Sequence, residues 1–460
     1  MKIAVIGGGI TGVTTAYALS QRGFDVALFE RHRYPAMETS FANGGQLSAS
    51  HAEAWNSWSN VRKGLGWMLR ADAPLLIRPA PSWHKLSWFG EFLRAIPRYR
   101  DTTVAIARLA VDARAYLFDW AHVEGIDFDL RREGILHVCR DKAGFEHAAG
   151  VSALLAQGGL QRRAVTPLEM RAIEPALHGA YYGGFFTESD SSGDIHKFTS
   201  GLSVACERRG VRILCERVVI ALAAGASGAA DTAPHGPAAA TGMQSAAAAG
   251  PGAVQAAAEG AGRRSGSGGV VVTARHGDVV EAHGFDAVVI CAGTASRALA
   301  AMLGDRVNVY PVKGYSITVK LNDAASRTAA PTVSLVDDAH KLVASRFGED
   351  RYRVAGTAEF AGIDRDIRAD RVRPLTEWVQ DTFPSVSTKE VIPWAGLRPM
   401  MPDMLPRVGP GRRPGVFYNT GHGHLGWTLS AATAEIVADL VAQSAGMGYG
   451  ERMRPPGRAA

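Results

Sequence analysis

The first thirty residues alternate between apolar runs and a helical repeat. Residues 2–6 are apolar and partly β-branched, a pattern typical of a strand that is buried on both faces. A helical pattern follows over residues 10–22, and Gly23 stands where a helix commonly ends. A second apolar run at 26–29 leads to Glu30. This order predicts a strand–helix–strand unit of about 30 residues, the unit that begins a doubly wound domain.

The same two patterns continue along the rest of the chain. Helical spacing of apolar residues predicts helices over 83–96, 103–124 and 371–383, and another from about 428. Short apolar runs predict strands over 134–138, 182–186, 211–220, 270–273, 285–293, 307–320, 341–357 and 415–419. The mixture predicts an α/β chain, and 460 residues suffice for two or three folding units.

Residues 221–269 break this pattern. They contain 19 Ala and 11 Gly in 49 residues and very few large apolar side chains. Such a stretch buries too little apolar surface to offset the entropy of ordering it. Because predicted strands flank it, we expect an Ala/Gly-rich low-complexity insertion in the loop of a hairpin.

Composition and charge exclude several classes of protein. The chain is 47% hydrophobic and 20% charged, which excludes a disordered chain, a collagen and a coiled coil. The net charge of +6 is mild for this length and does not indicate a nucleic-acid partner. The four cysteines include no CxxC pair, so we expect neither a disulfide framework nor a metal site. No run approaches 18 apolar residues, and we therefore expect no membrane-spanning segment.

A glycine motif follows the first predicted strand. Gly7, Gly9 and Gly12 form GxGxxG at the start of the predicted helix, and Glu30 ends the next strand. Such glycines allow a tight turn, let the backbone approach a pyrophosphate and bring the helix close to the strand, while the acidic residue reaches a ribose hydroxyl. A dinucleotide site is the prediction. The motif alone leaves NAD and FAD open, but two later strands also end in glycine turns, at Gly293 and Gly421.

Four separate blocks resemble the FAD-dependent D-amino acid dehydrogenases. They are residues 38–48, 311–316, 396–400 and 419–428, and they stand in the family's order. The resemblance runs from residue 1 to about 442 and is interrupted only at 221–269. This family is related to the D-amino acid oxidases and glycine oxidases.

The resemblance implies a two-domain fold of the α+β kind. A Rossmann-like FAD-binding domain is expected from residues 1–50, 160–220, 270–306 and 395–445. An antiparallel-sheet substrate domain, or cap, is expected from 51–159 and 307–394, with 446–460 as a flexible tail.

The resemblance also implies which residues hold FAD without a covalent bond. Gly7, Gly9, Gly12 and Glu30 would bind the adenosine diphosphate half, Val219 would contact adenine through its backbone, and Gly421 to Gly426 would approach the flavin pyrimidine. Thr39, Ser40, Asn43, Gly45 and Gln46 would line the ribityl and isoalloxazine portions. The remaining cofactor candidates neighbour these: Ile10, Thr11, Arg31, Leu47, Ala292, Gly293, His422, Gly423, His424, Leu425, Trp427 and Thr428.

Three residues are the candidates for catalysis. Arg398 would grip the substrate carboxylate with two parallel hydrogen bonds, as the matching arginine does in the related oxidases. Tyr315 would place a hydroxyl over the substrate, and His51 would stand nearby. Hydride transfer from the substrate Cα to the flavin requires no side-chain base if the amine binds neutral, so none is assigned.

The predicted reaction is the oxidative deamination of D-amino acids, with electrons passed to a quinone or another respiratory-chain acceptor. One alternative is a dehydrogenase of cyclic D-imino acids such as D-proline or hydroxy-D-proline, since residues 48–55 resemble such members. A second is an oxidase that uses O₂, and a third is a flavin-binding assembly subunit without turnover.

Residues 51–100 hold five of the nine tryptophans. Core and cap packing explains them, and so does a patch that meets a membrane interface or an electron acceptor. We therefore expect a cytoplasmic protein, with a peripheral association with the inner face of the cell membrane as the sharper alternative.

Overall fold

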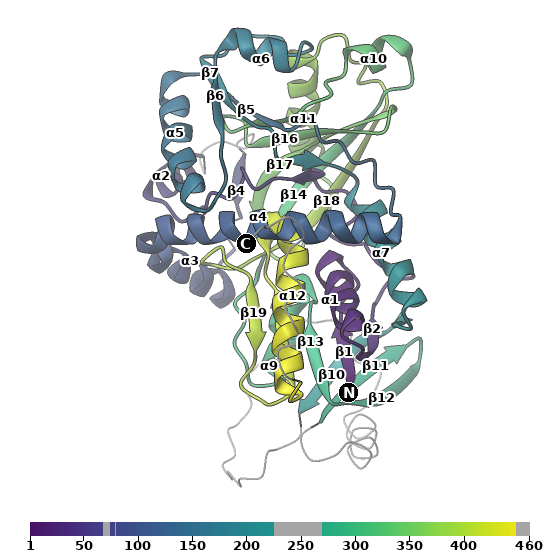
Figure 1. The fold of residues 1–460 in the computed structure, drawn as a ribbon. Helices are drawn as coiled ribbons and strands as arrows, with labels where there is room; N and C mark the ends of the chain where they lie inside the picture. The colour runs from purple at the N-terminus through teal and green to yellow at the C-terminus, as the bar shows by residue number, and fades with distance from the viewer. Residues whose placement is uncertain (68–73, 79, 225–268, 448–460) are drawn as a thin grey trace.

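The computed structural model describes residues 1–67, 74–78, 80–224 and 269–447. Two large β-sheets lie one above the other, and helices surround both (Figure 1). A long helix, α4 (Tyr99–Glu124), crosses the molecule between them in this view. The α/β two-domain fold class predicted from the sequence is confirmed: one sheet is mainly parallel and the other mainly antiparallel.

The lower sheet has six strands in the order β19–β20–β13–β1–β2–β9. Strands β1 (Lys2–Ile6), β2 (Asp25–Phe29), β9 (Arg212–Leu214), β13 (Ala287–Ile290) and β20 (Val416–Thr420) run parallel, and β19 (Arg407–Pro410) is antiparallel to β20. Ile3 and Val5 face one core cluster, whereas Ala4 and Ile6 face another. Both faces are thus buried, as the uninterrupted apolar run predicts.

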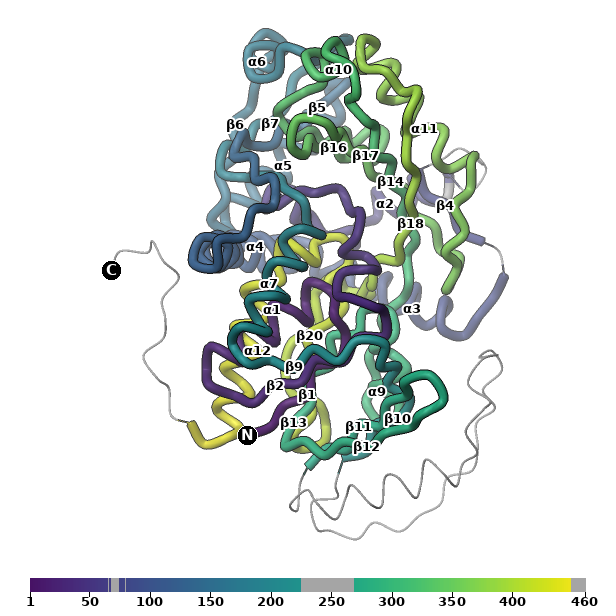
Figure 2. The backbone as a smooth tube through the Cα atoms, turned by 90° about the vertical axis from the view of Figure 1, so that its right-hand side faces the viewer, coloured from purple at the N-terminus to yellow at the C-terminus, as the bar shows by residue number. Residues whose placement is uncertain are grey.

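Different elements cover the two faces of this sheet (Figure 2). Helices α1 (Ile10–Gln21), α7 (Ile195–Arg208) and α12 (Gly426–Ser444) pack on one face. A three-stranded sheet of β10 (Val218–Ala224), β11 (Val270–His276) and β12 (Val279–Phe285), together with α9 (Ser296–Met302), packs on the other.

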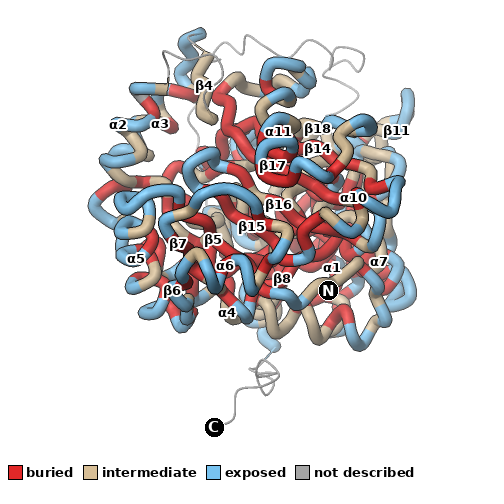
Figure 3. The backbone as a smooth tube through the Cα atoms, turned by 90° about the horizontal axis from the view of Figure 1, so that it is seen from above, coloured by how far each residue is buried: buried red, intermediate tan, exposed pale blue. Residues whose placement is uncertain are grey.

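The upper sheet has nine strands, eight of them in the order β18–β14–β17–β16–β15–β5–β7–β6, with β4 paired to β17. Its strands are β4 (Leu75–Ile77), β5 (Ile135–Cys139), β6 (Arg163–Val165), β7 (Gly183–Thr187), β14 (Tyr310–Lys320), β15 (Ser334–Asp337), β16 (Leu342–Phe347), β17 (Arg351–Phe360) and β18 (Val391–Met400). Most pairs are antiparallel, but β5–β15 and β4–β17 are parallel. Seen from above, the central strands are buried within a ring of exposed segments (Figure 3).

The remaining elements lie around this sheet and at the junction. The helices are α2 (Trp58–Trp67), α3 (Trp83–Ala95), α5 (Lys142–Gln157), α6 (Pro167–Ile173), α10 (Ala324–Ala329) and α11 (Ala369–Thr382). The short strands β3 (Gln46–Leu47) and β8 (Ser191–Ser192) pair with each other.

The sheets divide the chain differently from the predicted domain boundaries in three places. β6 and β7 fall within 160–220 but pair in the upper sheet, because β7 lies antiparallel to β5. β18 belongs wholly to the upper sheet, although 395–400 was assigned to the FAD-binding domain. α4 falls in the predicted cap, yet Leu117 and Trp120 belong to the core between the lower sheet and the helices that cover one of its faces, α1, α7 and α12. Periodicity identifies a strand or helix but not the neighbour against which it packs.

The Ala/Gly-rich stretch begins later than predicted. Residues 221–224 still belong to β10, which pairs antiparallel with β11, so the predicted hairpin is present. Residues 225–268 and 448–460, which hold most of the predicted insertion and tail, lie outside the described residues.

One helical segment, Gly423–Ser444, is long and apolar enough to cross a membrane by length and composition. Two thirds of its most apolar 18-residue stretch is buried inside the protein, where α12 packs against α1 and α4. Core packing therefore explains its apolar character.

Candidate active site

A cavity of about 1610 Å³ lies where the two sheets meet. It extends from the β1–α1 turn, past the loop 38–48, to β14, β17 and β18 and to the turn before α12. Every residue proposed from the sequence lines this cavity except Gly12 and Leu47. Residues from all four blocks on which the family resemblance rests line this one cavity.

The β1–α1 turn is built by its glycines. Gly7 has a φ of +108°, and a Cβ there would lie 2.7 Å from the carbonyl oxygen of Cys291. A Cβ on Gly12 would lie 1.7 Å from the carbonyl oxygen of Gly7, which explains why Gly12 packs the helix but does not line the cavity. Gly9 caps α1 without a side chain, so the helix N-terminus is open to an anion.

Glu30 lies at the end of β2, beside this turn. It is 6% exposed, and its carboxylate accepts hydrogen bonds from the backbone N–H groups of Gly8 (2.6 Å) and His32 (2.8 Å). These contacts fix the carboxylate at the cavity wall, the position expected of a ribose-binding acid. Arg31 forms an ion pair with Glu38 at the rim.

The loop 38–48 connects the two sheets. Thr39 donates a hydrogen bond to the carbonyl oxygen of Leu397 (2.8 Å), and the amide of Gln46 donates to that of Leu335 (3.0 Å). Gly45 has a φ of +69°, and a Cβ there would overlap the Phe347 ring. Leu47 is buried in the core on the helix-covered face of the lower sheet, where α1, α7 and α12 pack. In this loop Ser40 accepts from the N–H of Ile10, and Asn43 accepts from that of Gly45.

The later segments return to the same cavity, as the sequence predicts for FAD. β13 ends at Ile290 and leads into Ala292–Gly293, and β20 leads through Gly421 and a short turn into α12. The N-terminus of α12 has no side-chain cap. Trp427 Nε1, His422 Nδ1 and Gln46 Oε1 are buried without a hydrogen-bond partner among the described residues, so polar groups remain to hold a ligand. Val219 lines the far end at a bulge in β10. This donor set and glycine cradle fit FAD.

Arg398 projects from β18 into the upper part of the cavity. Its guanidinium donates to the backbone carbonyls of Thr357 (2.6 Å) and Gly356 (3.3 Å), and no carboxylate pairs with it among the described residues. Burial lowers the pKa of Arg398 to about 10, which still leaves the group charged at neutral pH. A Cβ on Gly314 would lie 2.3 Å from the Arg398 Cζ, so glycine makes room for the guanidinium. A half-buried cation that lines a cavity and has no anion beside it is suited to bind a carboxylate.

The backbone that receives Arg398 is unusual. Thr357 has a φ of +58°, a left-handed conformation that is strained for a β-branched residue. Such strain persists where surrounding structure holds it, and here it aims a carbonyl at the guanidinium. This feature leaves no signal in the sequence.

Tyr315 lines the cavity, but its hydroxyl is engaged. It donates to Glu359 (2.9 Å), a carboxylate that also lies near the buried Lys313 ammonium (3.7 Å). Burial and Glu359 raise the pKa of Tyr315 well above its ordinary value. The placement of this hydroxyl over the substrate stays a prediction. Its hydrogen bond to Glu359 could not be predicted, because the sequence does not reveal that Lys313 and Glu359 are neighbours across β14 and β17.

Two imidazoles and an indole form the wall near Arg398. His424 stacks on Trp55 with ring centroids 5.0 Å apart, and His51 packs edge-on against His424 at 5.2 Å. Burial, with smaller effects of His51 and Arg398, lowers the pKa of His424 to about 3. Burial likewise lowers the pKa of His51 to about 4. Both histidines are therefore neutral at pH 7.

The sequence reasoning missed the groups behind His51. They are Glu53, His137, His147, Arg162 and Asp338, and they come from five separate segments. No motif unites them, so only the fold brings them together. Within the described part of the chain, no group of three or more acidic, His or Cys side chains is arranged to hold a metal ion.

Comparisons with known proteins agree with this geometry. The family model for FAD dependent oxidoreductases matches residues 2–262 and 231–440. A D-amino acid dehydrogenase 3 from Mesorhizobium japonicum is 55% identical over 96% of this chain and 97% of its own length. A D-amino acid dehydrogenase from Paramagnetospirillum magneticum is 38% identical over 96% and 95%.

Solved structures agree on the fold. A glycine oxidase from Geobacillus kaustophilus superposes with a TM-score of 0.67 at 20% identity, covering 96% of this chain and 94% of its own. The family model confirms the predicted cofactor, FAD. The chain belongs to the FAD-dependent oxidoreductase family and, within it, to the D-amino acid dehydrogenases.

Proposed function

We propose that this dehydrogenase oxidises D-amino acids whose carboxylate is held by Arg398, and that it passes the electrons to a membrane quinone. The oxidative deamination of D-amino acids with FAD is the activity that its relatives and its family support. The observation that carries the proposal is Arg398, a half-buried guanidinium without an acidic partner among the described residues, at the opposite end of the cavity from the dinucleotide turn.

The chain's own residues position the substrate. Arg398 holds the carboxylate through two N–H groups, while the carbonyls of Gly356 and Thr357 fix the guanidinium itself. The Trp55–His424 wall restricts where the substrate side chain lies. FAD, when bound, supplies the chemistry of hydride acceptance. Water then hydrolyses an acyclic imino acid to the 2-oxo acid and ammonia.

Anaerobic bleaching of the yellow protein tests the substrate class. Paired D- and L-enantiomers of several amino acids are added, and the loss of the flavin absorbance is followed. We expect bleaching by D-enantiomers and none by L-enantiomers. Bleaching by neither, or by L alone, would contradict the function.

Cyclic D-imino acids are a second candidate substrate class. The flat Trp55–His424 pair beside Arg398 is suited to pack against a compact ring such as that of D-proline. Adding D-proline and hydroxy-D-proline to the same panel tests this, with the variant Trp55→Ala. If the ring packs on this wall, Trp55→Ala raises the KM for D-proline about tenfold while that for D-alanine changes little.

An exposed apolar face on α3 supports a membrane acceptor. Trp83 is 85% exposed, Leu86 55% and Leu93 44%, and their spacing places them on one side of the helix. Leu86 and Leu93 also line the cavity. Arg94 and Arg98 are exposed beside them, as suits an anionic surface. A quinone dissolved in the bilayer would thus enter next to α3, with the protein on the inner face of the cytoplasmic membrane.

Vesicle sedimentation tests this part of the proposal. We expect binding to vesicles that contain anionic lipid, and loss of at least tenfold in binding for Trp83→Ser/Leu86→Ser. Leu168→Ser is the matched control, because Leu168 is 77% exposed on α6. Equal binding by all three proteins would contradict the membrane face. Faster turnover with O₂ than with a soluble quinone would instead favour an oxidase.

A further inference from the structure

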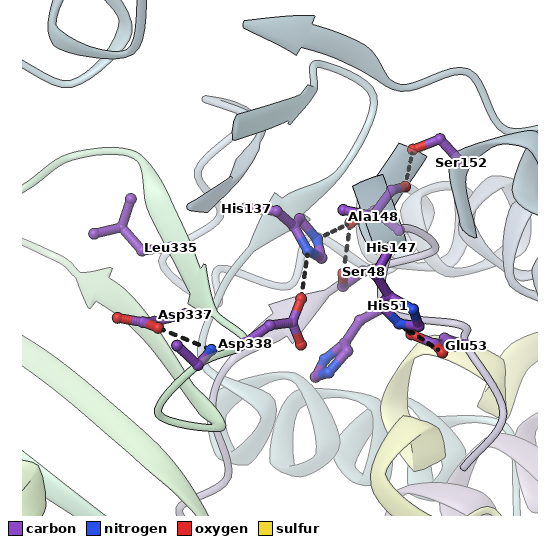
Figure 4. A network of polar contacts seen from close by, with 12 residues as sticks. Ser48, His51, Glu53, His137, His147, Ala148, Ser152, Leu335, Asp337 and Asp338 are labelled. Carbon is purple, nitrogen blue, oxygen red and sulfur yellow. Dashed lines mark hydrogen bonds and ion pairs between the residues drawn. The ribbon is translucent and has the colours of Figure 1, made fainter. Parts of the chain in front are cut away.

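A cluster of titratable side chains lies beside the substrate end of the cavity (Figure 4). His137 comes from β5, Asp338 follows β15, and His147 lies on α5, while His51 and Glu53 belong to the loop after β3. These four segments converge only in the fold. The reaction as derived so far uses none of the groups behind His51.

A second, small cavity lies within this cluster. Its volume is about 20 Å³, which is room for roughly one water molecule. His51, Glu53, His147 and Asp338 line both this cavity and the large one, so the two adjoin. Arg162 and His137 also line the small cavity, together with Ser50, Ala148 and Val151.

The small cavity has the polar lining that a bound water requires. The Nε and Nη2 atoms of Arg162 and the Nδ1 atom of His137 are buried, and none has a partner within hydrogen-bond distance among the described residues. The Asp338 carboxylate lies 3.8 Å from His137 Nδ1, a separation that a water can bridge. Buried polar groups in proteins are nearly always satisfied, if not by protein then by ordered water. Three orphaned atoms around a cavity of this size therefore indicate a water held by Arg162 and His137.

Close contacts connect this cavity to the substrate side and to the surface. The His51 ring lies edge-on to the His137 ring at 6.3 Å and to the His424 ring at 5.2 Å. His137 Nε2 lies 2.8 Å from the Ser50 hydroxyl, which fixes that ring. On the outer side, His147 lies 3.1 Å from Glu53, and 48% of the His147 side chain is exposed.

The reaction requires that a proton leave the substrate. An amino acid at neutral pH carries an ammonium group, and its oxidation to the iminium removes a hydride from Cα and one proton from nitrogen. The N–H electron pair becomes the new C=N bond, and the hydride is accepted by FAD. One proton is left over, and some group near Arg398 must receive it.

We propose that His51 accepts the ammonium proton of the substrate and that the water held by His137 and Arg162 passes it to Glu53 and His147 at the surface. The proposal rests on D-amino acid oxidation at Arg398. No hydrogen-bond partner holds the His51 ring within the described part of the chain, and the ring lines both cavities. His51 is thus the acceptor, and His137 and Arg162 position the water.

His51 is neutral at pH 7, so its ring has a lone pair that can take a proton, and its low pKa means that the proton is passed on rather than kept. Burial lowers its pKa to about 4, and His137, Lys341 and Arg162 act in the same direction, whereas Asp338 opposes them. His424 also packs against the ring. Asp338 stays ionised, since His137 and Lys341 hold its pKa well below the usual range. This anion favours a proton in transit.

Flavin bleaching by a D-amino acid, measured anaerobically from pH 6 to pH 10, tests the acceptor. In His51→Gln and His51→Asn we expect about a 100-fold slower rate at pH 7. The rate of both variants should approach that of the wild type at high pH, where the substrate amine is already neutral. His84→Gln is the matched control, because burial also lowers the pKa of His84 to about 4 but that residue lines neither cavity.

Proton release tests the path. In weakly buffered solution with a pH indicator, we expect the wild type to release its proton as fast as the flavin bleaches. In His137→Gln bleaching should persist while release lags. Flavin content and thermal midpoint are measured for each variant to separate misfolding from lost proton transfer.

The outcomes separate the proposal from the function beneath it. An unchanged pH profile in both His51 variants, or an equal loss at every pH, overturns the role of His51 while bleaching by D-amino acids stands. A wild type that no D-amino acid bleaches overturns the dehydrogenase function itself, and this proposal with it.

Discussion

The two ends of the large cavity are built from different materials. At the β1–α1 turn, the binding surface is formed by the backbone: Gly7, Gly9 and Gly12 shape the turn, and backbone N–H groups hold the Glu30 carboxylate. At the substrate end, the binding surface is formed by side chains from distant strands, and the Arg398 guanidinium packs directly against Gly314. The first end is encoded within thirty consecutive residues, whereas the second exists only once the upper sheet has formed. The two ends should therefore fail separately.

The largest effect is expected at the backbone-built end. Gly12→Val places a Cβ about 1.7 Å from the Gly7 carbonyl, so α1 must move away from β1. We expect FAD affinity to fall at least about 100-fold, measured by flavin content and by fluorescence titration of the apoprotein. Gly90→Ala on α3 is the control, because nothing lies within 4 Å of a Cβ there. Full flavin content in Gly12→Val would contradict the packing role of Gly12.

A smaller effect is expected at the side-chain-built end, and it should change substrate binding rather than FAD binding. Gly314→Ala brings a Cβ within 2.3 Å of the Arg398 guanidinium and pushes it from its seat. We expect KM for a D-amino acid to rise roughly tenfold while flavin content stays normal. Steady-state kinetics with a soluble dye acceptor measure this. A loss of FAD without a change in KM would show that the two ends are not independent.

The smallest effect concerns the free energy of unfolding in acid. It depends on His51 and His422, two cavity-lining histidines whose pKa values are lowered. Burial lowers the pKa of His51 to about 4 and of His422 to about 3. Below pH 6.5 the unfolded chain gains protons on these residues before the folded chain does, so stability is lost as the pH falls from 6.5 toward 4. Each such histidine contributes a slope of about 1.4 kcal/mol per pH unit.

Thermal midpoints between pH 7 and pH 4 check this. His422→Gln should flatten the decline by a few degrees, whereas His276→Gln, at an exposed position on β11, should leave it unchanged. A decline that is equally steep in both variants would contradict the role of burial at His422.

The same contrast explains what sequence could predict. The turn at Gly7–Gly12 and the acid Glu30 were predicted because their order along the chain is their order in space. Arg398 was predicted only through the family resemblance, and Gly314 beneath it was missed. The hydrogen bond from Tyr315 to Glu359 was not predicted, because Glu359 lies 44 residues later in the chain. The cluster at His137 and Arg162 was missed for the same reason. Its residues come from segments that carry no motif and that lie next to one another only in the fold.

Anaerobic titration of Arg398→Met tests the central account most directly. The account predicts a yellow protein with normal flavin content that dithionite bleaches fully and that D-amino acids bleach at least about 1000-fold more slowly than they bleach the wild type. Arg398→Lys, which keeps the charge but not the paired N–H groups, should fall between them. Bleaching of Arg398→Met by D-amino acids at the wild-type rate would contradict the assignment of Arg398 as the carboxylate anchor.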